Sequence, residues 1–228
     1  MNNFWLALAV FIGSHVVAAV PGLRRTLIAR WSEHGFLLAY SSMSLGLFVW
    51  LIAAAIHSPT TPLWAPSSGA YLVPLILMPI AAVLLGASLF APNPLSIAFV
   101  PGTLDTERPG AVAITRHPTL WGLGLWGLSH VPPNGDTVMV TLFGGLGFFA
   151  FVGMAIVERK KRSALGADWA RLAAGTSYLP FVALLTGRAH WRARTSTYVG
   201  AAIGAAAAAF LLLGGHLLLF NRDPLALF

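Results

Sequence analysis

Long apolar runs alternate with short polar segments along the chain. Six apolar segments stand out, at about Phe4–Val20, Phe36–Ile56, Tyr71–Phe90, Leu120–Val131, Val138–Val157 and Tyr198–Phe220. A helix needs about 20 apolar residues to cross the hydrocarbon core of a bilayer. Five segments approach that length, whereas the fourth would rise only about 18 Å as a helix. The pattern predicts an all-α polytopic membrane helical bundle of about six transmembrane segments with a short fourth one.

Two prolines and one shorter apolar segment add detail to the prediction. Pro74 and Pro79 fall inside the third run, where proline removes helical hydrogen bonds and favours a kink. Leu179–Leu185 is too short to cross a bilayer and is better placed at the membrane interface. No repeat of useful period occurs, so residues 1–228 are predicted to form a single membrane domain.

Composition supports the membrane assignment and excludes several classes of chemistry. Only 9% of the residues are charged and 57% are hydrophobic, whereas a soluble domain carries about 25% charged residues. The chain has no cysteine, which excludes disulfides, thiolate ligands, iron–sulfur clusters and a cysteine nucleophile. The net charge of +7 does not indicate nucleic acid, because the basic residues lie between apolar runs. They indicate a lipid bilayer as the partner.

The basic residues also predict the orientation of the chain. The loops after the first, third and fifth segments hold 13 of the 14 lysines and arginines. Cytoplasmic loops carry an excess of Lys and Arg. These three loops are therefore predicted to be cytoplasmic, with the N-terminus on the outer side.

Three histidines lie within the apolar segments, His15, His130 and His216, and no site is assigned to His216. An ionisable side chain in a membrane is costly and marks a functional site by default. His15 lies inside the first segment, and His130 ends the fourth on the same helical face as Trp126 and Gly127. Either imidazole suits a metal ion. The alternatives are a hydrogen bond to a neighbouring helix for His15 and a contact with the helix dipole for His130.

Further candidates lie at the cytoplasmic ends of the segments. Arg116 and His117 open the fourth segment, where they suit an anionic group at a helix N-terminus or a snorkelling pair at the interface. Thirteen residues separate His117 from His130, about 20 Å along a helix, so one continuous helix cannot bring both to one metal. Glu158 and Arg159 follow the fifth segment, where a charge-balanced helix end is the simplest interpretation.

Several blocks of this sequence resemble the NnrU family. Arg116-His117-Pro118, Leu125–His130 and Asn134-Gly135-Asp136 resemble its core signature. Arg162–Trp169, Thr176–Phe181 and Gly187-Arg188 resemble its second half, and the His15 segment followed by Arg24 resembles its opening. The resemblance covers about residues 4–190, and the joint order of the blocks is specific although each block alone is weak.

The resemblance implies a multi-pass protein of the bacterial inner membrane, in a family linked to nitrite and nitric oxide reduction, or denitrification. The related plastid zeta-carotene isomerase binds haem b and converts a cis double bond of a polyene to trans. Its two axial histidines fall on His15 and His130 of this chain, while its cysteine three residues before the second histidine is replaced by Gly127. Trp121 and Trp126 would pack against the haem or a hydrophobic, lipid-like substrate.

Depth counting leaves a second pairing open. His15 lies near the cytoplasmic end of its segment and His130 near the outer end of its own, a difference in depth of about 10 Å. His117 is therefore the alternative partner of His15. The predicted cofactor-binding set is His15, His130, His117, Trp126 and Arg116.

A wider resemblance leads to a different function. Arg116-His117-Pro118, Glu158-Arg159 and Gly166-x-x-Trp169 are also similar to blocks of membrane methyltransferases of the isoprenylcysteine and phospholipid type. This resemblance implies S-adenosylmethionine held by His117, Glu158 and Arg159, with a lipid as the substrate. A non-enzymatic membrane assembly factor is the third alternative.

Overall fold

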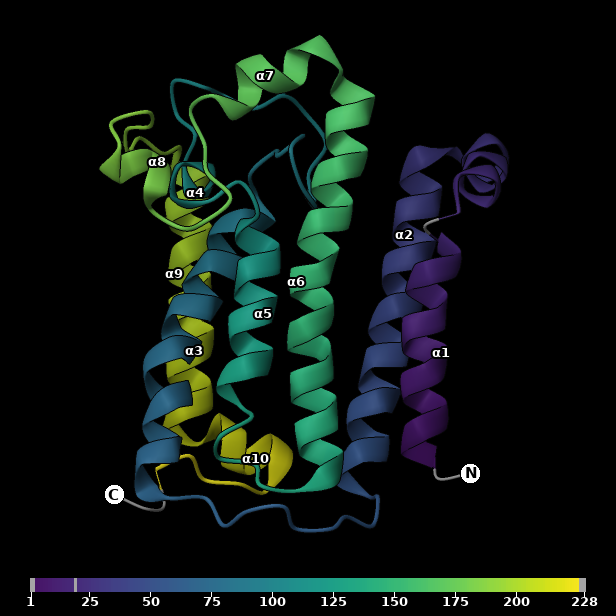
Figure 1. Cartoon of the computed structure of the whole chain (residues 1–228), viewed down its shortest axis with the longest axis vertical. Helices are drawn as coiled ribbons and strands as arrows, with labels where there is room; N and C mark the ends of the chain where they lie inside the picture. Colours follow the sequence, from purple (N-terminus) through teal and green to yellow (C-terminus); the bar gives the residue numbers. More distant parts are fainter. Residues whose placement is uncertain (1–2, 19, 226–228) are drawn as a thin grey trace. The chain divides into compact units, whose positions relative to one another are not determined.

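The computed structural model describes residues 3–18 and 20–225, and within them the predicted all-helical fold is confirmed. Figure 1 shows the helices in chain order: α1 (Asn3–Ala18), α2 (Pro21–Ile56), α3 (Ser68–Leu89), α4 (Ala111–Ile114), α5 (Pro118–Ser129), α6 (Thr137–Leu165), α7 (Ala167–Ala173), α8 (Val182–Leu185), α9 (Thr195–Phe210), the π-helical turn η1 (Leu211–Gly215) and α10 (His216–Phe220). Among these residues, β pairing is limited to one isolated bridge, between Pro62 and Asp136.

Four helices of the described chain are long and apolar enough to cross a membrane. They cover Gly22–Ile56, Ser68–Leu89, Thr137–Leu165 and Thr195–Phe220. The first and fourth predicted segments form shorter helices, α1 and the 12-residue α5. The short fourth segment is thus confirmed, whereas the total of six crossings stays a prediction. Ala19, within the predicted first segment, lies outside the described residues.

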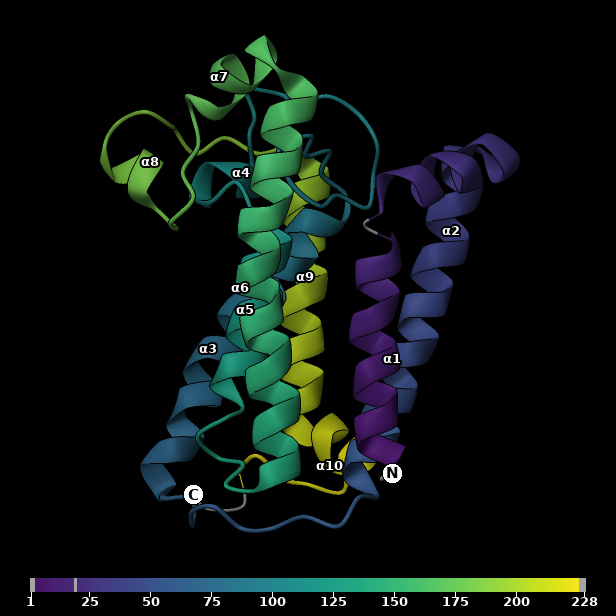
Figure 2. The ribbon, with the colours of Figure 1, turned by 45° about the vertical axis from the view of Figure 1, so that its right-hand side comes forward.

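The beginning of α2 differs from the sequence prediction. The residues around Arg24 and Arg25, predicted to form a loop, are helical, because Pro21 occupies the first turn and presets its backbone. Ser32 then adopts a non-helical backbone (φ 69°, ψ 167°) and divides α2 into two parts. Figure 2 shows the change of direction near the start of α2. The basic part can therefore run differently from the apolar part that suits a membrane span.

Other boundaries follow the sequence more closely. α3 continues through Pro74 and Pro79 without a non-helical residue, so the prolines do not break it. α6 extends past Val157 to Leu165 and carries the basic run as part of the helix. The predicted interfacial segment Leu179–Leu185 contains the short helix α8.

The chain divides into two compact units. The first comprises residues 1–64 and 136–142, with α1 packed against α2. Within it, the Phe11 and Phe48 rings lie 6.1 Å apart between their centroids. The second comprises residues 65–135 and 143–228, and in it α3 packs against both α5 and α9.

Glycine allows the helices of the second unit to approach backbone to backbone. A Cβ atom added to Gly86 of α3 would lie 2.1 Å from the carbonyl oxygen of Gly200 in α9. Gly204 meets the Ala82 carbonyl in the same way. Gly127 of α5 likewise faces the backbone of α6, because a Cβ atom added to it would lie 2.7 Å from the Gly147 nitrogen. Small residues at such crossings are typical of membrane helices, whose association depends on close packing.

A cap of loops and short helices (residues 91–117 and 166–194) covers one end of the helices of the second unit. Its core consists of Leu95, Leu104, Val112 and Trp169, which are all buried. Figure 1 shows α4, α7 and α8 in this region. At the other end, Gly214 (φ 131°) interrupts the last helix, and α10 follows the break. The cap is the part of the unit that positions its buried polar residues.

We expect Gly86→Ala to destabilise the protein by about 1–3 kcal/mol, because the added methyl group meets backbone atoms that cannot move aside. Gly145→Ala in α6 is the matched control, since a Cβ there has no atom within 4 Å. Thermal unfolding in detergent measures both. Equal stability of the two variants would show that the α3–α9 crossing tolerates a wider spacing.

Candidate functional site

The Arg116–His117 segment is fixed by backbone hydrogen bonds within the cap. The Arg116 N–H donates to the Ser177 carbonyl at 2.8 Å, and the Asn93 side-chain amide donates to the Arg116 carbonyl at 2.9 Å. His117 caps α5, and Pro118 occupies the first helical turn, as the sequence predicted. The two side chains are therefore held at the start of α5.

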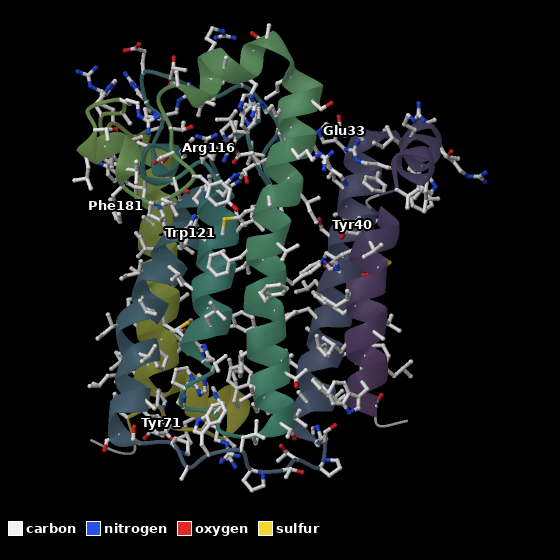
Figure 3. The ribbon with its side chains drawn as sticks, viewed as in Figure 1. Glu33, Tyr40, Tyr71, Arg116, Trp121 and Phe181 are labelled. Carbon is white, nitrogen blue, oxygen red and sulfur yellow. The ribbon has the colours of Figure 1, made fainter. Side chains whose placement is uncertain are left out.

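Glu158 of α6 binds both of these side chains. Its Oε1 lies 3.1 Å from Arg116 Nη1, and its Oε2 lies 2.8 Å from His117 Nε2. On the other side of the ring, His117 Nδ1 lies 2.7 Å from the Ser96 hydroxyl oxygen. The His117 side chain is fully buried, and Glu158 is 26% exposed. Figure 3 labels Arg116 in the upper part of the second unit. We call Arg116, His117, Glu158 and Ser96 the Glu158 network.

The proton arrangement of the Glu158 network follows from its chemistry. Burial lowers the pKa of His117, although the hydrogen bond and the charge of Glu158 oppose the shift. The ring is therefore neutral at pH 7, with one donor and one acceptor nitrogen. An ionised carboxylate only accepts, so Nε2–H donates to Glu158, and Nδ1 accepts from the Ser96 hydroxyl. Both ring nitrogens are engaged, so His117 would bind a metal only by giving up one hydrogen bond.

Arg116 has one donor that the protein does not satisfy. Its guanidinium carbon lies 5.6 Å above the Trp169 ring, and Nη1 is bound to Glu158. Its Nε is buried without a hydrogen-bond partner among the described residues.

Arg159, the third residue predicted for a methyltransferase site, is exposed and takes no part in the described Glu158 network.

His130 ends α5 at the opposite end from this network. Its Nδ1 lies 2.7 Å from the Trp126 carbonyl oxygen, which can only accept, so the ring donates from Nδ1. The ring stacks on Phe143 with 4.7 Å between centroids and 21° between planes, and Trp126 lies at 5.9 Å.

His15 has the same local arrangement within the first unit. Its Nδ1 lies 2.8 Å from the Phe11 carbonyl oxygen, and the Ser44 hydroxyl lies 3.4 Å from its Nε2. The rings of Phe11 and Tyr40 are 4.5 Å and 5.8 Å from the imidazole. In both histidines the bond from Nδ1–H to a carbonyl makes Nε2 the nitrogen that can accept a hydrogen bond or bind a metal, and in His15 this nitrogen contacts Ser44. Metal-binding histidines commonly have their other nitrogen bonded in this way.

The members of the predicted set that lie in the second unit fall into two groups. Arg116 and His117 belong to the Glu158 network, whereas Trp126 belongs to the surroundings of His130. Trp121 donates its indole N–H to the Tyr178 carbonyl at 3.0 Å and packs on Phe151. No group of three or more His, Asp or Glu side chains suited to a metal ion occurs in the part of the chain that is described.

Some members of these surroundings had no clear sequence signal. Ser96 lies 21 residues before His117 in an irregular loop, and only the folded cap brings the two together. Tyr178, whose ring meets the His117 ring edge at 5.3 Å, is part of a recognised block but carried no assigned role. His216 lies in α10 after the break at Gly214, and the sequence assigns it no site.

A family comparison identifies the chain. A sequence model of the NnrU family, described as NnrU protein, matches residues 3–224. The chain belongs to the NnrU family. The match confirms the sequence resemblance and extends over both units of this NnrU protein. No curated protein and no solved structure matches the chain.

We expect the stability of this NnrU protein to fall as the pH drops below about 6.5, and His117→Gln to reduce that loss. The unfolded chain binds a proton at the usual histidine pKa of about 6.5, whereas burial lowers the pKa of His117 in the fold. Stability from the neutral ring is thus present above pH 6.5 and is lost below it, at up to about 1.4 kcal/mol per pH unit.

Unfolding in detergent at several pH values between 7.5 and 5 measures this loss. His57→Gln is the control, because His57 is exposed at the end of α2. A pH dependence that is the same in the wild type and in His117→Gln would contradict the assignment of a neutral, buried imidazole.

Proposed function

We propose that this NnrU protein binds haem b, with His130 and His15 as the axial ligands. The observation that carries the proposal is the matching state of the two imidazoles. Each donates Nδ1–H to the carbonyl four residues earlier, which makes Nε2 the acceptor nitrogen, and Nε2 of His15 also lies 3.4 Å from the Ser44 hydroxyl oxygen. Imidazole is a frequent axial ligand of haem iron. The bonded Nδ1 fixes the tautomer that can bind iron through Nε2.

The surroundings of both histidines suit a flat apolar group. Phe143 and Trp126 flank His130, and Phe11 and Tyr40 flank His15. Arg116 and His117 do not fit this group, since they belong to the Glu158 network at the other end of α5.

Haem iron would supply a redox-active centre, which is the chemistry common to a redox-gated isomerase and to a factor in nitrite or nitric oxide metabolism. The residues of this chain would hold the group and exclude water. The apolar helices around the histidines favour a hydrophobic, lipid-like substrate over a charged one. The axial ligands and the aromatic rings beside them would set the potential of the iron.

We expect protein purified from haem-replete cells to give a reduced-minus-oxidised absorption spectrum of b-type haem. His130→Ala and His15→Ala remove axial ligands, so each should abolish or shift this spectrum. His57→Ala is a close control, because His57 also places Nδ1 2.7 Å from the carbonyl four residues earlier, yet is exposed at the end of α2.

Haem-free protein from such cells would overturn the proposal, as would spectra unchanged in both variants. A spectrum lost in His130→Ala and retained in His15→Ala would contradict the pairing. His216→Ala would then test another histidine of the second unit.

The Glu158 network supports a second candidate, an S-adenosylmethionine-dependent methyltransferase acting on a lipid. The supporting observation is the 2.8 Å contact between Glu158 and His117, two of the three residues that the methyltransferase resemblance implies. A carboxylate at this position can accept hydrogen bonds from the ammonium group or the ribose hydroxyls of the cofactor.

We expect Glu158→Gln to weaken S-adenosylmethionine binding at least about tenfold if this second function is correct, because a charge-assisted hydrogen bond is lost. Glu107→Gln is the control, since Glu107 is an exposed carboxylate in the loop after α3. Calorimetry in nanodiscs measures the binding. The wild type failing to bind the cofactor would remove this candidate.

A further inference from the structure

A small cavity lies in the cap of the second unit. None of the residues of the Glu158 network lines it. It has a volume of about 130 Å³ and is lined by residues of the loop after α3, of α7 and of the segment after α8. Its polar side chains are those of Thr106, Arg171, Thr176, Arg188 and His190. At about 30 Å³ per water molecule, this volume suits one phosphate-sized group.

Arg188 is held in a fixed position at this cavity. Its Nε donates to the Thr186 hydroxyl at 3.1 Å, and its Nη1 donates to the carbonyls of Thr176 and Ala174 at 3.1 and 3.3 Å. These partners are neutral, so the positive charge is oriented without being paired. The Nη2 donors have no hydrogen-bond partner among the described residues. A fixed guanidinium with free donors suits an anion that accepts two hydrogen bonds.

The charge around the cavity is strongly positive. No aspartate or glutamate side chain lines it. Residues 91–118 and 158–194 hold ten arginines and lysines against four carboxylates. Of those carboxylates, Asp168 pairs with Arg171, and Asp105 pairs with Arg194. An excess of cations therefore remains to attract an anion.

Exposed apolar side chains lie next to the cavity and indicate where its ligand comes from. Leu179, Phe181 and Leu185 are 56%, 52% and 83% exposed on and just before α8. Figure 3 labels Phe181 at the edge of the second unit. Trp191 follows the cavity residues, and its indole N–H donates to the Tyr198 hydroxyl at 3.2 Å. Exposed apolar and aromatic residues beside arginines are typical of segments that lie at the lipid headgroup level.

We propose that this cavity binds a phosphate group, and that its source is the headgroup of an anionic phospholipid in the cytoplasmic leaflet. Arg188 makes the direct contact, with Arg171 and His190 beside it. The residues around α8 lie in the headgroup layer and bring the cavity to the lipid. The proposal is independent of haem and of S-adenosylmethionine, because it uses none of their predicted ligands.

Native mass spectrometry of the full-length protein in detergent tests the proposal, with phosphatidylglycerol or phosphatidylcholine added. We expect tighter binding of phosphatidylglycerol, and Arg188→Gln to weaken it at least about fivefold, because hydrogen bonds to a charged group are lost. Arg162→Gln is the control, since it removes one exposed charge of the basic run and does not line the cavity. It should weaken binding by less than about twofold.

A separate titration with inorganic phosphate identifies the source of the group. If inorganic phosphate binds in a way that depends on Arg188 and phosphatidylglycerol is not preferred, the cavity is a phosphate site. That result would overturn the assignment of a lipid headgroup as its ligand. Equal losses in Arg188→Gln and Arg162→Gln would overturn the site itself. Arg188 also closes its own loop, so a double variant, Arg171→Gln with His190→Gln, is decisive if Arg188→Gln fails to fold. Unchanged lipid binding in that variant would overturn the proposal.

Discussion

Close backbone contact between helices is the constraint on which the second unit depends. The hydrophobic effect does not drive apolar helices together inside a lipid bilayer. Their association therefore depends on van der Waals contact over a large, closely packed area. Gly86 of α3 supplies it by meeting Gly200 and Gly204 of α9 without an intervening side chain. α5 is too short to be an ordinary span, and it packs against α3 and, through Gly127, against α6. The position of His130 at its end follows from this packing.

The Glu158 network joins the cap to the helices. One carboxylate from α6 binds both charged or polar residues at the start of α5, and Ser96 of the preceding loop completes the arrangement. Burying charged and polar groups is costly unless each one is paired. Here Glu158 pairs with Arg116 and His117, and the Ser96 hydroxyl pairs with the other nitrogen of His117. Arg116 Nε is the exception. The network therefore fixes the end of a short helix at the boundary between the apolar helices and the polar cap.

Much of this architecture could be predicted from the sequence. Apolar runs located the helices, and His117-Pro118 marked the start of α5 because proline fixes the backbone of a first helical turn. The helical state of the Arg24 segment was missed, since its charges suggested a loop. The partnership of His117 with Glu158 was included only as part of a methyltransferase resemblance. Ser96 could not be found, because irregular loops carry no periodic signal that places a side chain.

The predicted metal-binding histidines show the same limit. Sequence position identified His15 and His130, but the bonded state of their Nδ1 atoms required the helix around each ring. The helix break at Gly214, which precedes His216, was not predicted, because an isolated glycine in an apolar run does not specify one. Candidate residues could thus be named from the sequence, whereas the contacts between residues far apart in the sequence could not.

The crossing at Gly127 restricts how this protein can evolve. A Cβ at this position would lie 2.7 Å from the Gly147 nitrogen and from the Phe143 carbonyl oxygen. Any larger side chain at this position, cysteine included, would therefore push α5 and α6 apart. A thiolate could be introduced three residues before His130 only together with a compensating change in α6.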